Sequence, residues 1–132
     1  MIKYRIEFFQ PREFVCKCCG TGRVASSLVY TLDMIRRCWD GPVIINSAFR
    51  CAKHNREVGG AEQSRHLIGC AADIRPLDPA LIGPFQYLLQ HLTARREEGW
   101  ELKLYPTFVH IGVPRIESAN LWSGGQINLN IK

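Results

Sequence analysis

Three side chains between residues 66 and 110 have types that suit a metal site: His66, Asp73 and His110. Two imidazoles and one carboxylate suit zinc, and three protein ligands leave a fourth position for water or substrate. Such an open position is what a catalytic zinc requires, since the metal lowers the pKa of bound water and polarises a carbonyl group. However, a histidine in an apolar strand is more often structural, and an aspartate beside small residues often only caps a turn. Residue types alone therefore leave the zinc site as a hypothesis.

Each of the three candidates lies next to a backbone feature that would fix its position. His66 precedes a predicted turn at a glycine, and Asp73 follows that turn in a predicted strand of small residues, 70–74. His110 lies in the middle of a second predicted strand, 108–113, and reaches the site from distant sequence. A turn between His66 and Asp73 would bring these two side chains together, and His110 would close the site.

Four segments of the chain resemble a known family in the right order. Residues 64–73 (SRHLIGCAAD) match the pattern S-x-H-x-x-G-x-A-x-D of zinc D-alanyl-D-alanine carboxypeptidases and their relatives, which include phage endolysins and the hedgehog signalling domain. The other resembling segments are 46–60 (NSAFRCAKHNREVGG), 105–111 (YPTFVHI) and 13–19 (EFVCKCC). Together they cover the chain from residue 13 to about residue 113.

The resemblance implies a set of functional residues and a substrate. It implies zinc on His66, Asp73 and His110, and an Arg50 that meets the carboxylate of the substrate or the developing oxyanion. A guanidinium suits that role because it stays charged and offers a planar set of donors. Ser47 is expected to support the same pocket. The implied substrate is the stem peptide of peptidoglycan, either at a terminal D-alanine or at a cross-bridge.

The carboxylate that should act as general base is missing from its expected places. In the family it lies three residues before the last histidine, or two residues after it in short members. Here those positions hold Thr107 and Gly112, and neither can accept a proton as a carboxylate does. The nearest acidic residues are Glu101 and Glu117, but neither lies at the expected spacing from His110. A further candidate is Glu62, four residues before His66.

Three functions stay open on this evidence. The chain is an active peptidase with a relocated base, a zinc-binding relative that recognises wall peptide without cutting it, or a structural component of a virion. Loss of a general base costs a factor of about 10² to 10⁴ in rate, so a weak residual hydrolysis would not be surprising even without that carboxylate.

Six cysteines are many for 132 residues. Because the start of the chain does not look like a secretory signal, reduced thiols or metal ligands are expected rather than a disulfide framework. Cys16 and Cys19 form a C-x-x-C pair, but there is no second such pair, so core packing of reduced thiols is the default and a structural zinc is the alternative. The residues that could complete such a site are Cys38, Cys51 and His54, while Cys18 has no assigned role and Cys70 is expected in the core.

Apolar periodicity and turn signals predict one domain over residues 1–132 with an α+β fold. The predicted helices run from a serine cap at Ser26 or Ser27 to about 39–41, and from an Asp78 cap to about Arg96. The predicted strands are 42–46, 70–74, 101–105, 108–113 and, less regularly, 126–131; residues 11–23 and the segment around Gly59 are predicted to be loop and turn. We expect a small, mainly antiparallel sheet with helices on the face opposite the metal site, as in hedgehog and D-Ala-D-Ala peptidases.

The amino-acid composition and charge of the chain limit the kinds of binding partner that are expected. At 46% hydrophobic and 22% charged residues the chain resembles an ordinary globular domain, and no apolar run reaches the roughly 20 residues that span a bilayer. The net charge of +5 is spread along the chain without interleaved aromatics, so nucleic-acid binding is a weak alternative. We expect synthesis in the cytoplasm, followed by release to the cell wall or incorporation in a virion in the case of a phage protein. Nothing in the sequence determines the oligomeric state.

Overall fold

The computed structural model describes residues 2–94, 98–115 and 120–129. In chain order the elements, with η for 3-10 helices, are β1 (Ile2–Arg5), η1 (Pro11–Phe14), α1 (Ser26–Cys38), β2 (Val43–Ser47), α2 (Ala52–Glu57), η2 (Arg65–Ile68), β3 (Ala71–Pro76), η3 (Pro79–Leu81), α3 (Ile82–Thr93), β4 (Glu101–Leu104), β5 (Val109–Gly112) and β6 (Gln126–Leu129). The α+β prediction is confirmed.

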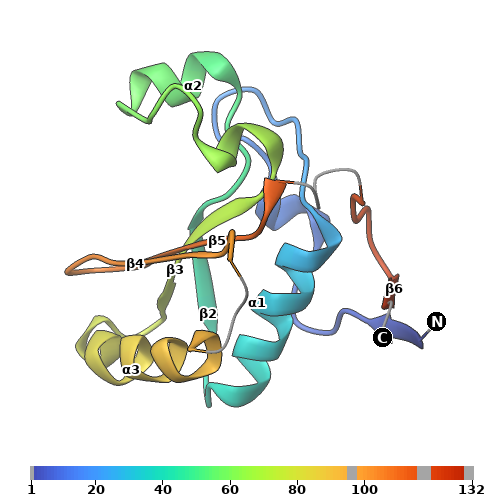
Figure 1. Cartoon of the computed structure of the whole chain (residues 1–132). Helices are drawn as coiled ribbons and strands as arrows, with labels where there is room; N and C mark the ends of the chain where they lie inside the picture. Colours follow the sequence, from blue (N-terminus) through green and yellow to red (C-terminus); the bar gives the residue numbers. More distant parts are fainter. Residues whose placement is uncertain (1, 95–97, 116–119, 130–132) are drawn as a thin grey trace.

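The main sheet has four strands in the order β2-β3-β5-β4, and every neighbouring pair is antiparallel. Strands β4 and β5 form the predicted hairpin, closed by a hydrogen bond from the Tyr105 N–H to the Phe108 carbonyl at 3.0 Å. The sixth strand does not extend this sheet, because it pairs with β1 in a separate two-stranded ribbon that the sequence did not indicate. Figure 1 shows this ribbon beside the two chain ends, away from the main sheet.

Alternation along the strands separates a core face from a site face. On the core face, Ala72 and Ile74 of β3 and Val109 and Ile111 of β5 are fully buried. They belong to one cluster with the buried apolar side chains of the two long helices, Leu28, Val29, Leu32 and Ile35 of α1 and Phe85 and Leu89 of α3. In Figure 1, α1 and α3 lie on one side of the sheet and α2 lies on the other. Asp73 and His110 alternate with the core residues and therefore point toward the α2 side.

Several predicted boundaries and segments are wrong. Helix α1 is preceded by Ala25 without a side-chain cap, so the two serines lie inside its first turn rather than at the cap. Asp78 does cap a helix, with its carboxylate accepting the Ala80 N–H at 3.0 Å, but that helix is η3, which continues into α3. The predicted end of the second helix at Arg96 lies outside the described residues.

Two segments predicted as loop and turn contain short helices. Residues 11–23 include η1, and the segment between β2 and β3 includes α2 and η2. Only Asn55 is buried in α2, so the six-residue helix has no apolar period to detect.

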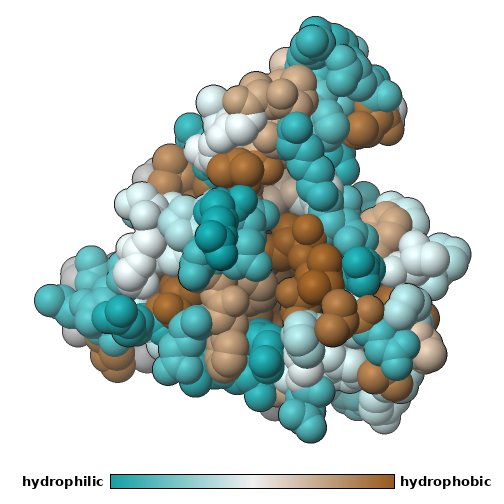
Figure 2. Space-filling model, turned by 180° about the vertical axis from the view of Figure 1, so that it is seen from behind, coloured by the Kyte–Doolittle hydropathy of each residue, from teal (hydrophilic) through white to brown (hydrophobic). Residues whose placement is uncertain are grey.

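Among the described residues no helix is long and apolar enough to cross a membrane. Figure 2 shows the opposite side of the molecule, where hydrophobic side chains are grouped in the middle of a largely polar surface.

Candidate metal centre

Strand register brings residues from all four strands of the main sheet into one row. Asp73 of β3 lies opposite His110 of β5, and on their outer sides these two pair with Ser47 of β2 and Lys103 of β4. A bulge between Ile45 and Ser47 shifts the register of β2, and Ser47 is thereby the residue that pairs with Asp73. The two strand ligands proposed from sequence are thus direct cross-strand neighbours.

His66 reaches the row from η2 and is nearly completely buried. Its Nδ1 lies 2.6 Å from the Ala48 carbonyl oxygen, which can only accept a hydrogen bond, so Nδ1 carries the proton. Gly69 then ends η2 in the left-handed conformation, with φ at 74°, and its position leaves no room for a side chain against the Arg23 carbonyl. This is the predicted glycine turn, and it returns the chain into β3, which carries Asp73 seven residues after His66.

His110 is held between two carboxylates. Its Nδ1 lies 2.9 Å from Asp73 Oδ1, and its Nε2 lies 3.0 Å from Glu101 Oε1. Burial lowers the pKa of His110, but the two carboxylates outweigh burial and raise it. Burial likewise raises the pKa of Asp73, but the contacts with His110 and His66 hold it well below its usual range. Asp73 is therefore the fixed negative charge of the site.

The three side chains fit a zinc ion by geometry and by an unsatisfied atom. Their ligand atoms all lie within 4.8 Å of one another. His66 Nε2 lies 3.3 Å from Asp73 Oδ1, which in turn lies 2.9 Å from His110 Nδ1. A tetrahedral ion with bonds of about 2.0–2.2 Å holds neighbouring ligand atoms roughly 3.3–3.6 Å apart, so the first distance fits directly and the second would have to lengthen by about 0.4 Å. His66 Nε2 is buried, lacks a hydrogen-bond partner and presents its lone pair to a carboxylate oxygen, a contact that a cation between them would make favourable.

Arg50 and Ser47 lie beside this group. The Arg50 guanidinium donates to Asp73 Oδ2 at 3.2 Å, to Ser47 Oγ at 3.1 Å and to Asn55 Oδ1 at 3.3 Å. Its position is fixed further by the backbone, since the Arg50 N–H donates to the His66 carbonyl at 3.0 Å. A guanidinium carries five N–H donors, so these three side-chain bonds leave donors for a ligand.

Glu101 contacts His110, although its position in the sequence did not predict that it reaches the site. It pairs directly with Gly112 across the β4–β5 hairpin, so its side chain lies on the same face as His110. A Cβ atom added at Gly112 would lie 2.7 Å from Glu101 Oε1, which means that the glutamate fills the space left by the glycine. Burial raises the pKa of Glu101, but the contact with His110 and the charge of Arg65 outweigh it and lower the pKa, so the carboxylate stays ionised.

The other acidic candidates do not reach the site in the described part of the chain. Glu62 is exposed in the turn before η2, and Thr107 is exposed at the tip of the hairpin. Glu117 lies outside the described residues.

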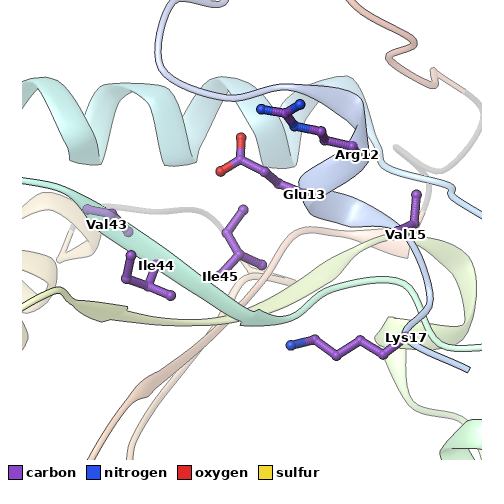
Figure 3. Close-up of a pocket in the computed structure, with 7 residues that line it drawn as sticks. All are labelled: Arg12, Glu13, Val15, Lys17, Val43, Ile44 and Ile45. Carbon is purple, nitrogen blue, oxygen red and sulfur yellow. The ribbon is translucent and has the colours of Figure 1, made fainter. Parts of the chain in front are cut away.

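A separate surface hollow (Figure 3) is lined by residues of η1, the loop after it and the edge strand β2: Arg12, Glu13, Val15, Lys17, Val43, Ile44 and Ile45. None of these is a predicted site residue, so this hollow is distinct from the candidate metal centre.

The fold and the site define a class: a small α+β domain whose antiparallel sheet presents two histidines and an aspartate with the arrangement of an open zinc centre. Residues 7–112 match the family model of Peptidase M15, and the chain belongs to that family. M15 peptidases are zinc-dependent enzymes that act on peptidoglycan. No curated protein and no solved structure matches the chain.

Proposed function

We propose that this protein is a zinc-dependent peptidase that hydrolyses a peptide bond in peptidoglycan stem peptides, either at a terminal D-alanine or at a cross-bridge. The observation that carries the proposal is the combination of the His66, Asp73 and His110 group with an ionised Glu101 at its edge. The first three supply a metal site, and the fourth supplies the carboxylate that sequence positions 107 and 112 lack.

Zinc held by His66, Asp73 and His110 would polarise the scissile carbonyl and lower the pKa of the attacking water. Glu101 has two tasks in this scheme. Its Oε1 accepts a hydrogen bond from His110 Nε2 and so fixes the orientation of that ring, as carboxylates commonly do for metal-binding histidines. We assign to the same carboxylate the removal of a proton from the attacking water, because it is ionised and already contacts the proposed ligand His110.

Arg50 is the proposed binding residue for the negative charge of the substrate. Its side chain is largely buried, with 14% of its surface exposed, and it is held by Asp73, Ser47 and Asn55. A cation fixed in this way can receive a terminal carboxylate or a developing oxyanion without losing much conformational freedom. Binding of a terminal carboxylate at Arg50 would favour a carboxypeptidase, whereas an oxyanion develops in either reaction.

The test is direct hydrolysis of defined substrates. The zinc-loaded protein is incubated with purified stem peptides that end in D-alanine and with cross-linked dimers, and the products are followed by mass spectrometry. Loss of one alanine from the monomer indicates a carboxypeptidase, whereas splitting of the dimer indicates an endopeptidase. Intact peptides in the presence of bound zinc would reject the enzymatic proposal.

A second candidate is a zinc-containing module that binds wall peptide without cutting it. It is favoured by the absence of a carboxylate at Thr107 and Gly112, and by the fact that Glu101 Oε1 is already engaged by His110 and lies 3.6 Å from Arg65 Nε. This candidate predicts retention of stem peptides on the immobilised protein with no products after long incubation.

Moving the carboxylate across the hairpin tests the pairing of Glu101 with Gly112. Gly112→Asp alone is expected to lower kcat/KM by about 10²-fold, because the new side chain would displace Glu101 and a misplacement of about 1 Å has this cost. The swap of Glu101→Gly with Gly112→Asp returns a carboxylate to the same register pair and should be more active than Glu101→Gly alone. Equal rates for these last two variants would show that the two positions do not share one site.

A further inference from the structure

A second group of potential metal ligands lies outside the candidate zinc centre. The sulfur atoms of Cys16, Cys18 and Cys51 all lie within 4.8 Å of one another, and the Sγ atoms of Cys18 and Cys51 are 3.9 Å apart. Cys16 and Cys18 come from the loop after η1, whereas Cys51 is the cap residue of α2 and accepts the His54 N–H on its Sγ at 3.4 Å. Two segments more than thirty residues apart therefore converge on three thiols.

The loop is folded around the sulfur of Cys16. The Cys16 N–H donates to the Thr21 carbonyl at 2.6 Å, the Gly20 N–H donates to the Cys16 carbonyl at 2.8 Å, and a bridge between Val15 and Gly22 closes the loop. The Cys16 side chain is buried, and its Sγ accepts the Cys51 N–H at 3.4 Å. A backbone N–H directed at the sulfur favours the thiolate, which is the form that binds zinc.

Neither core packing nor a disulfide uses all three of these sulfurs. Cys18 is exposed and Cys51 is half-buried, so they are not core residues like Cys70. A disulfide between Cys18 and Cys51 would leave out Cys16, the buried sulfur that accepts the Cys51 N–H. Zinc with Zn–S bonds of about 2.3 Å holds its sulfurs roughly 3.8 Å apart, close to the 3.9 Å between Cys18 and Cys51.

We propose that Cys16, Cys18 and Cys51 bind a second, structural zinc ion, whose existence does not depend on the proposed peptidase activity. The fourth ligand is Cys19, which completes the C-x-x-C pair, or His54, which lies within 4.8 Å of Cys18 together with Glu57. A site closed by four protein ligands is structural rather than catalytic. It ties the loop after η1 to the start of α2, immediately after Arg50, and so holds in place the segment that carries the proposed substrate-binding arginine.

Counting zinc in variants separates the two sites. The double variant His66→Ala with His110→Ala removes two ligands of the candidate catalytic centre and should still contain one zinc per chain by native mass spectrometry under reducing conditions. Adding Cys18→Ser and Cys51→Ser should reduce this to none. Cys38→Ser, an exposed cysteine at the end of α1, is the matched control and should leave the count at one. Adding Cys19→Ser or His54→Ala to the same background assigns the fourth ligand.

Cobalt substitution of the unmodified protein gives a readout that does not depend on variant folding. Thiolate ligands produce an intense sulfur-to-cobalt charge-transfer band in the ultraviolet, which a site of two histidines and one aspartate cannot produce. The band is expected in the wild-type protein and in the double histidine variant, and not after Cys18→Ser with Cys51→Ser. A wild-type protein without this band, or a double histidine variant without zinc, overturns the proposal. A Cys18–Cys51 disulfide in freshly purified protein would overturn it as well.

Discussion

Asp73→Asn is expected to abolish zinc binding at the candidate catalytic centre. All measurable hydrolysis should be lost with it. Asp73 contacts both histidines and Arg50, and the two histidines hold its pKa low against the effect of burial, so it is the one negative charge shared by the whole group. An asparagine keeps the shape but not the charge. Substitution of residues that only support metal ligands already lowers metal affinity by about 10- to 100-fold, and a direct ligand should lose more.

The measurement for Asp73→Asn is zinc affinity by competition with a chromophoric chelator, in a background that carries Cys18→Ser and Cys51→Ser so that only one site is counted. Far-ultraviolet circular dichroism checks that the fold is retained. Asp40→Asn, an exposed aspartate beyond α1, is the matched control and should bind as the parent does. An Asp73→Asn protein that is folded and binds zinc with the affinity of its parent would exclude Asp73 as a ligand.

Two substitutions of Glu101 should have different consequences. Glu101→Gln keeps an oxygen that can accept the hydrogen bond from His110 Nε2, but it cannot take up a proton. It should therefore bind zinc nearly as well as the wild-type protein while kcat falls by about 10² to 10⁴, the usual contribution of a general base. Glu101→Ala also removes the support of His110 and should lose a further 10- to 100-fold in zinc affinity.

Steady-state kinetics on a stem peptide, together with zinc competition, separates these effects for each variant. Glu98→Gln is the control, because that glutamate is exposed in the segment just before β4. If Glu101→Gln hydrolyses the peptide at the wild-type rate while Glu101→Ala loses zinc, then Glu101 only positions His110 and another group accepts the proton.

The strands of the main sheet could be predicted from the sequence because they have an apolar face. In the two strands that carry Asp73 and His110, every second residue is apolar and buried. This alternation is typical of a strand with one face in the core, and its residues are Ala72, Ile74, Val109 and Ile111. The hairpin was also predicted with its turn at Pro106–Thr107. A tight turn there pairs residue 105 with 108 and therefore residue 101 with 112. The register that places Glu101 beside the site was already implied by that turn, whereas counting along a single strand from His110 missed it.

Other features could not be found from patterns of this kind. Helix α2 is six residues long and buries only Asn55, so it lacks the apolar period on which helix prediction depends. Strand β1 is short, and most of its residues are exposed, and only its pairing with β6 makes it a strand. The approach of Cys51 to Cys16 and Cys18 depends on how η1 and β2 pack together, which no spacing in the sequence records.

The most direct test of the zinc centre is a crystal structure of the zinc-loaded protein with anomalous diffraction measured on both sides of the zinc absorption edge. We expect an anomalous peak bonded to His66 Nε2, to Asp73 and to His110, with a fourth position that no protein side chain fills. If these three side chains contact one another in the crystal and no zinc peak lies among them in protein saturated with the metal, the proposed centre does not exist.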